Sequence, residues 1–132
     1  MIRAVVFDAW AWWETLLGTP TGLKLRTKYL EEPEVRVLTV DLALAEISSK
    51  MARGGIPEEV KPALNAVEAG SDVIPISRAA AEAAGPLVVE LRKTDRGASL
   101  VDAIMLASAR EHGATLVSGE AAFKGQSDVV AV

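Results

Sequence analysis

The chain has 132 residues, of which 50% are hydrophobic and 24% charged, and its formal net charge is −4. This length and composition predict one soluble domain over residues 1–132. The absence of cysteine excludes disulfides and thiolate metal sites, and the negative charge argues against holding long nucleic acid by bulk electrostatics. The short apolar run before Asp8 predicts neither a signal peptide nor a membrane span, hence a cytoplasmic location.

The first half of the chain is predicted to contain two strands and four helices. Residues 2–7 form a continuous apolar run rich in β-branched side chains, which is typical of a strand buried on both faces of a parallel sheet. A second such run covers residues 35–40. Glycines and prolines separate the helices that we expect at residues 10–17, 21–30, 41–53 and 57–69.

The second half continues the alternation of strands and helices. Ser77 is expected to cap a helix that reaches about residue 93, in which Pro86 is a candidate break, and Ser99 to cap a helix that ends near residue 113. Strands are expected at residues 72–76, 114–118 and 127–132. Strands that alternate with helices predict an α/β fold, a three-layer α/β/α sandwich around a mainly parallel sheet.

Asp8 directly follows the first predicted strand. Ligands of open parallel sheets bind beyond the carboxyl ends of the strands, so an acid at this point is well placed for function. The alternative is that Asp8 only caps the helix that follows, because Asp is a preferred N-cap residue. Asp8 alone does not decide between these two roles.

Two further acids lie on predicted helices with apolar faces. Glu46 is in the segment LALAEI, so we expect a partly buried carboxylate that needs either a basic partner or a metal ion. Asp102 has apolar neighbours, and the spacing from Ser99 to Asp102 is that of a capping box, so Asp102 can also satisfy amides in the first helical turn. Each acid therefore has a structural and a functional interpretation.

Glu120 follows the strand predicted at residues 114–118, which places it at the same edge of a parallel sheet as Asp8. Ser118 is positioned to hydrogen-bond Asp8 or to orient a metal-bound water. A cluster of Asp8, Glu46, Asp102 and Glu120 would repel itself, and Mg²⁺ or Mn²⁺, which prefer oxygen ligands, would neutralise it. The single histidine and the lack of cysteine argue against zinc.

These residues resemble the PIN-domain family, specifically VapC-type toxin ribonucleases, over essentially the whole chain. The resemblance lies in the order and spacing of VVFDAW, LALAEI, SLVDAIMLASAR and GATLVSGEAAF. It implies that Ser118 supports a site whose Mg²⁺ or Mn²⁺ ligands are Asp8, Glu46, Asp102 and Glu120. The family more often has Asp at position 120 and a small hydroxyl residue at position 9, where this chain has Ala9. The fourth ligand is therefore open, with Asp128 as the alternative.

The resemblance also implies an activity. We expect an endoribonuclease, the toxin of a type II toxin-antitoxin pair, in which one or two metal ions activate a water that attacks an RNA phosphodiester. Contacts to RNA need basic residues near the acids. The first candidates are Arg92, Lys93 and Arg96, and the second are Lys50, Arg53 and Lys124.

The expected partners are a VapB-type antitoxin that occupies the acidic site and a second copy of the chain. Three tryptophans on one early helix, Trp10, Trp12 and Trp13, more often build the core or a subunit interface than stack on bases, and we favour the interface. His112 is predicted to be a surface residue at a helix C-terminus.

Two other functions remain open. The segment AVVFDAW also resembles the nucleophile strand of haloacid-dehalogenase-type phosphatases, although Ala11 and Trp12 stand where those enzymes usually have a Gly-Thr pair. The other alternative is a non-catalytic PIN-like binding module. The sequence favours the nuclease, because four acids from four separate segments fit it and only the first segment fits a phosphatase.

Overall fold

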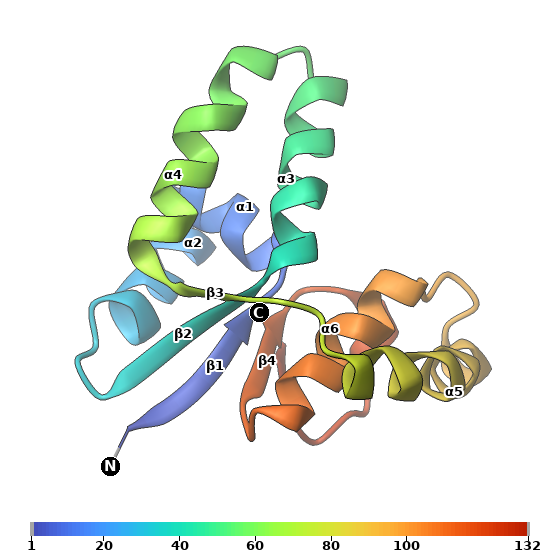
Figure 1. Cartoon of the computed structure of the whole chain (residues 1–132). Coiled ribbons are helices and arrows are strands. Elements are labelled where there is room, and N and C mark those ends of the chain that lie inside the picture. The colour runs from blue at the N-terminus through green and yellow to red at the C-terminus, as the bar shows by residue number, and fades with distance from the viewer. Residues whose placement is uncertain (1, 132) are drawn as a thin grey trace.

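Within residues 2–131, which the computed structural model describes, five strands form one parallel sheet in the order β3-β2-β1-β4-β5 (Figure 1). The first strand of the sequence lies at the centre and pairs with β2 on one side and β4 on the other. The strands are β1 (Arg3–Phe7), β2 (Val35–Val40), β3 (Asp72–Ile74), β4 (Thr115–Ser118) and β5 (Val129–Ala131). The carboxyl ends of all five therefore meet at one edge.

Helices cover both faces of this sheet, which confirms the predicted three-layer sandwich (Figure 1). Residues such as Val6 and Leu116 pack against the α5–α6 layer, and alternate residues such as Val5 and Val117 pack against the α1–α4 layer. The helices are α1 (Ala9–Leu17), α2 (Pro20–Leu25), α3 (Asp41–Arg53), α4 (Val60–Gly70), α5 (Arg78–Thr94) and α6 (Leu100–Glu111).

Short helical turns complete the chain, and several predicted bounds shift. Helix 21–30 begins at Pro20 and becomes a π-helical turn over Arg26–Leu30, and 3₁₀ turns lie at Pro57–Glu59 and Ala121–Phe123. The strand expected at residues 72–76 ends at Ile74. Val132, within the last predicted strand, lies outside the described residues.

Pro86 does not break α5, because the helix runs through it to Thr94. A proline removes one backbone donor and strains one turn, but α5 buries Ala84, Val88 and Leu91 on both sides of it. This packing holds the two halves of the helix in line. Whether a proline breaks a helix therefore depends on how the residues around it pack in the tertiary structure.

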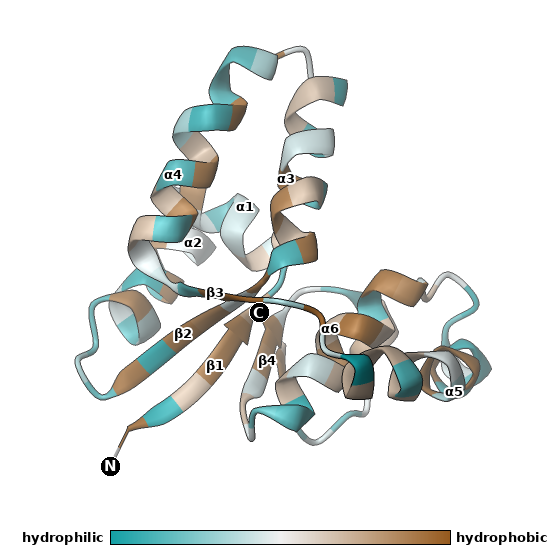
Figure 2. Cartoon of the chain, in the orientation of Figure 1, coloured by the Kyte–Doolittle hydropathy of each residue, from teal (hydrophilic) through white to brown (hydrophobic). Residues whose placement is uncertain are grey.

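The interior of the sheet is strongly apolar and its helical cover is amphipathic. Figure 2 shows hydrophobic colour along much of β1 and β2, whereas polar and apolar residues alternate along α3 and α4. Such helices bury one face and expose the other. Of the helices within residues 2–131, none combines the length and apolar character needed to cross a bilayer.

The three tryptophans of α1 occupy different environments. Trp12 is only 2% exposed, and its indole N–H donates to the Thr39 hydroxyl at 2.9 Å. Trp12 belongs to the core, so its predicted role in a subunit interface is wrong. Trp10 and Trp13 are half-buried and lie nearer the carboxyl edge of the sheet and α3. In α1 the side chain of Trp12 points toward the sheet. The spacing of the three tryptophans in the sequence did not reveal which of them would be buried.

Candidate active site

Asp8 links the central strand to the first helix. It follows β1, is 5% exposed, and caps α1 by accepting the Ala11 backbone N–H at 2.8 Å. The two roles open from the sequence are therefore compatible, because the cap uses Oδ1 while the other oxygen faces β4. This arrangement fixes the carboxylate at the end of the strand.

Ser118 ties the ends of β1 and β4 together. Its hydroxyl donates to Oδ2 of Asp8 and accepts the backbone N–H of Glu120 at 3.0 Å. The hydrogen bond expected between Ser118 and Asp8 is thus present. The second bond orients the first residues beyond β4, so one buried hydroxyl positions both Asp8 and the segment that carries Glu120.

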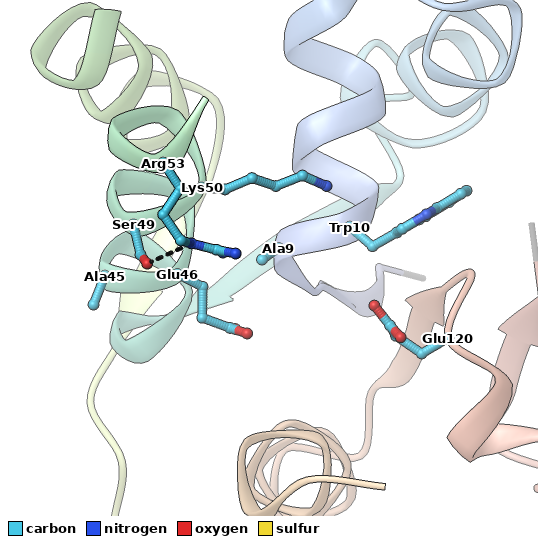
Figure 3. A pocket seen from close by; sticks show the side chains of 8 residues that line it. All are labelled: Ala9, Trp10, Ala45, Glu46, Ser49, Lys50, Arg53 and Glu120. Carbon is cyan, nitrogen blue, oxygen red and sulfur yellow. Dashed lines mark hydrogen bonds between the residues drawn. The ribbon is translucent and has the colours of Figure 1, made fainter. Parts of the chain in front are cut away.

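Glu46 lies on α3 and points into the space beyond the strand ends (Figure 3). Its carboxylate is half-buried, and within residues 2–131 it has neither a hydrogen-bond donor nor an ion-pair partner. The basic partner that would make Glu46 purely structural is therefore not found among the described residues. A half-buried carboxylate without a counter-charge is costly for the fold unless a cation binds there.

Asp102 occupies the first turn of α6 and completes a capping box. Its side chain accepts the Ser99 backbone N–H at 2.8 Å, and the Ser99 hydroxyl accepts the Asp102 N–H at 3.1 Å. This confirms the structural role predicted for it. The other carboxylate oxygen makes no hydrogen bond within the described residues, so Asp102 keeps an acceptor for a ligand.

The acids repel one another. Burial, the largest cause, together with the charges of Glu120 and Asp102, raises the pKa of Asp8 to about 7, even though hydrogen bonds from Ser118 and Ala11 oppose the change. Burial raises the pKa of the Glu46 carboxyl to about 7 as well, helped by the charges of Asp8, Asp102 and Glu120.

Glu120 belongs to the same electrostatic cluster. Burial raises the pKa of the Glu120 carboxyl, and the negative charge of Asp102 raises it further. The positive charge of the Lys50 ammonium opposes part of this rise. The four acids predicted from separate segments are therefore close enough to influence one another.

A cavity of about 540 Å³ opens beside this cluster (Figure 3). Two of the acids, Glu46 and Glu120, face it from opposite sides. Asp8 and Asp102 are not among its lining residues. The cavity is lined by Ala9, Trp10, Ala45, Glu46, Ser49, Lys50, Arg53 and Glu120.

The carboxylates match Mg²⁺ or Mn²⁺ in chemical type, but their oxygens do not converge on a single ion position. Carboxylate oxygens are the ligands that these ions prefer, and the pKa values of Asp8 and Glu46 are raised first by burial and then by the charges of the neighbouring acids. Among residues 2–131, however, no three Asp, Glu or His side chains are arranged to hold a metal ion. The residues fit such an ion by charge and chemistry, and side-chain movement would be needed to bring them together.

The basic residues predicted first for RNA binding do not line the cavity. Arg92 donates to the Ala98 carbonyl at 2.9 Å and braces the turn before α6, and Lys93 pairs with Glu90 at 2.8 Å. Arg96 is exposed in that turn. Among the candidates that the sequence ranked second, Lys50 and Arg53 line the cavity and Lys124 does not.

Asp128 lies apart from the cluster. Arg110 donates two hydrogen bonds to it, at 2.6 and 3.2 Å, and these bonds hold the pKa of the Asp128 carboxyl below its usual range. Asp128 has no part in the raised pKa values of Asp8, Glu46 and Glu120. Of the two candidates for the fourth acid, the geometry favours Glu120.

Sequence reasoning did not find the contact between Trp10 and Gly119. A Cβ atom at Gly119 would lie 2.6 Å from Cε2 of Trp10, so the indole rests directly on the backbone between Ser118 and Glu120. Only glycine lets the ring lie this close. The signal was present as a glycine directly after a predicted strand, but its partner depends on how α1 and β4 meet.

Comparisons with known proteins agree with this fold. The profile of the PIN domain matches residues 5–127, and a search of curated proteins finds no match. VapBC2 from Rickettsia felis, bound to promoter DNA, superposes with a TM-score of 0.73 at 17% identity, covering 98% of each chain. DNA-bound VapBC from Salmonella typhimurium has a TM-score of 0.74 at 13% identity, covering 100% of this chain and 98% of that chain.

A third solved structure is VapC20 from Mycobacterium tuberculosis, described as a sarcin-ricin loop cleaving toxin. It has a TM-score of 0.68 at 21% identity, covering 84% of this chain and 85% of that chain. At these identities the structural likeness establishes the fold, and the profile match establishes the family, whose members are generally nucleases. The chain belongs to the PIN-domain family.

Proposed function

We propose that this protein is a Mg²⁺- or Mn²⁺-dependent endoribonuclease. The observation that carries the proposal is the cluster of mutually repelling acids at the carboxyl edge of a parallel sheet, in a PIN domain. Among residues 2–131 none of these acids forms an ion pair, and a fold that accepts this electrostatic cost is well suited to bind a cation. The site residues we assign are Asp8, Glu46, Asp102, Glu120 and Ser118.

The chemistry follows from what each residue can do. When bound, the metal supplies Lewis-acid chemistry and an activated water for attack on the phosphodiester. Asp8 would anchor the site from the rigid centre of the sheet, with Ser118 holding its orientation. Glu46 and Glu120 would complete the site from opposite walls of the cavity, where an RNA phosphate can enter.

The partners are proposed from the relatives. The structures from Rickettsia felis and Salmonella typhimurium are described as VapBC, and one from Klebsiella pneumoniae, with a TM-score of 0.68 and 22% identity, as a toxin-antitoxin complex. These support a VapB-type antitoxin as the partner and a toxin role for this chain. A homodimer is proposed as well, on the resemblance to the family alone.

The phosphatase interpretation is abandoned, because the chain belongs to the PIN family. The geometry agrees, since both Asp8 oxygens accept hydrogen bonds and the side chain is 5% exposed, which suits an anchoring residue better than a covalent nucleophile. A non-catalytic PIN-like module is the alternative that the experiment must test.

The test combines metal binding with RNA cleavage. Isothermal titration of Mn²⁺ into wild type, Asp8→Asn and Glu46→Gln should show binding that both substitutions weaken at least about tenfold. Glu68→Gln, an exposed acid on α4, is the matched control and should bind as wild type does. Wild type should cut total bacterial RNA only with metal, and EDTA should stop it. Binding equal in all four proteins, with no cleavage by wild type, would remove the nuclease and leave the binding module.

A further inference from the structure

One face of α3 carries an acid and two bases toward the cavity. Glu46, Ser49, Lys50 and Arg53 are spaced so that a helix places them on one side, and all four line the cavity (Figure 3). Glu46 lies nearest the strand ends, and the two bases follow it along the helix. A positively charged strip thus begins one helical turn beyond a proposed metal-binding acid.

The Lys50 side chain extends from α3 toward α1 (Figure 3), and its ammonium lies 4.5 Å from the centre of the Trp13 ring. Trp13 itself is half-buried and packs against the core between the sheet and α1–α4, so the ring is a fixed surface. A cation held over an indole in this way loses little mobility when it later binds an anion.

Lys50 is close enough to Glu120 to lower the pKa of that carboxyl, but it is not tied to it by an ion pair. Within residues 2–131 no carboxylate forms an ion pair with its ammonium, even though Glu46 and Glu120 line the same cavity. The basic residues before α6 already have partners, because Lys93 forms an ion pair with Glu90 and Arg92 donates a hydrogen bond to a backbone carbonyl. Lys50 therefore keeps its donors for a ligand that enters the cavity.

We propose that Lys50, held over Trp13, binds a phosphate of the RNA strand next to the phosphate that is cleaved, and that Trp13 is the residue that positions it. This rests on the proposed function. An RNA strand that approaches an acidic cluster meets repulsion, and a fixed cation one turn away offsets that repulsion and sets the strand's register. Arg53, whose Nε donates to Ser49 at 3.2 Å, continues the same strip outward.

The first experiment measures RNA binding apart from cleavage. Fluorescence anisotropy with a short single-stranded oligouridine, in Ca²⁺, compares wild type with Lys50→Ala, Lys50→Arg and Lys61→Ala. Loss of one charge-assisted contact should weaken binding about tenfold in Lys50→Ala, and should lower the slope of log Kd against log salt by about 0.7. Lys50→Arg should retain most of the affinity. Lys61→Ala removes an exposed lysine from α4 and should bind as wild type does.

The second experiment tests the role of Trp13 through Lys50. Trp13→Leu should weaken oligouridine binding in the wild-type background and have no further effect in the Lys50→Ala background, whereas Trp13→Phe keeps a π face and should weaken binding less. A purely structural role for Trp13 would instead give equal losses in both backgrounds. Far-ultraviolet circular dichroism and thermal melting verify that each variant is folded, and an unfolded Trp13→Leu is replaced by Trp13→Phe in the same comparison.

The outcomes separate this inference from the nuclease proposal. If wild type cuts RNA with metal but Lys50→Ala binds oligouridine as tightly as wild type, the inference is wrong and the nuclease stands. If wild type does not cut RNA, yet Lys50→Ala binds oligouridine more weakly than wild type and with a smaller salt dependence, then Lys50 binds a phosphate and the nuclease proposal fails. If wild type does not bind oligouridine at all, the proposal that Lys50 binds an RNA phosphate is wrong.

Discussion

The Ser118 hydroxyl donates a hydrogen bond to the Asp8 carboxylate, joining the carboxyl ends of the two neighbouring strands β4 and β1. Because the same oxygen accepts the Glu120 backbone N–H, a single serine connects two acids that are far apart in sequence. Its neighbour Gly119 lies under the Trp10 indole, which adds a packing contact between the same two segments. The site is thus built where the central strand β1, its neighbour β4 and helix α1 contact one another.

Ser118→Ala should destabilise the protein by about 1–2 kcal/mol, because it leaves a buried Asp8 oxygen and the Glu120 N–H without their partner. Cleavage should fall about tenfold or more through loss of Asp8 orientation. Urea unfolding and RNA cleavage assays measure the two effects. The matched control is Ser108→Ala in α6, a serine that is also 2% exposed but whose Oγ has no partner within the described residues. Equal losses in both variants would contradict the role given to Ser118.

Asp8→Asn should have opposite effects on stability and on activity. Asn caps helices as well as Asp does, so the bond to Ala11 survives, while the buried charge disappears. Without metal at pH 8, the variant should therefore melt at a higher temperature than wild type. Its metal-dependent cleavage should fall about 100-fold or more. A lower melting temperature in metal-free buffer would mean that Asp8 stabilises the fold chiefly as an ion.

Stability of the metal-free protein should fall as the pH rises. The pKa values of Asp8 and Glu46 are raised from 3.8 and 4.5 to about 7 in the folded state, so between about pH 4 and pH 7 the folded protein binds more protons than the unfolded chain. Their protonation stabilises the fold at low pH, and this contribution is lost as the pH passes 7.

Mn²⁺ should therefore raise the melting temperature more at pH 8 than at pH 5.5, where it competes with protons for the same acids. Differential scanning fluorimetry across this range, with and without EDTA, makes the comparison. A shift independent of pH would place the metal away from Asp8 and Glu46.

Glu120→Gln and Asp128→Asn should separate the two candidates for the fourth acid. Glu120 lines the cavity and interacts with the acid cluster, so its substitution should weaken Mn²⁺ binding about tenfold. Asp128 is held by Arg110 near the surface, and its substitution should leave Mn²⁺ binding unchanged and cost at most about 1 kcal/mol of stability. Calorimetric titration of both variants gives the result, and the reverse order would assign the fourth position to Asp128.

Much of the fold could be predicted from sequence patterns. Continuous apolar runs at β1 and β2, the caps Ser77 and Ser99, and the alternation of strands and helices indicated a parallel three-layer sandwich, because these signals are local in the chain. The end of β3, the start of β5 and the continuity of α5 through Pro86 depended on packing. Local propensity does not contain that information.

The sequence by itself determined that Asp8 and Glu120 follow parallel strands and that Glu46 and Asp102 lie on helices with an apolar face, since strand ends and helix periodicity are readable along the chain. Tertiary structure alone decided which side chains meet. It laid the Trp10 indole on Gly119, paired Asp128 with Arg110, and placed Lys50 rather than Arg92 beside the acids. These choices depend on how helices cross the sheet edge, and packing between segments distant in sequence sets that geometry.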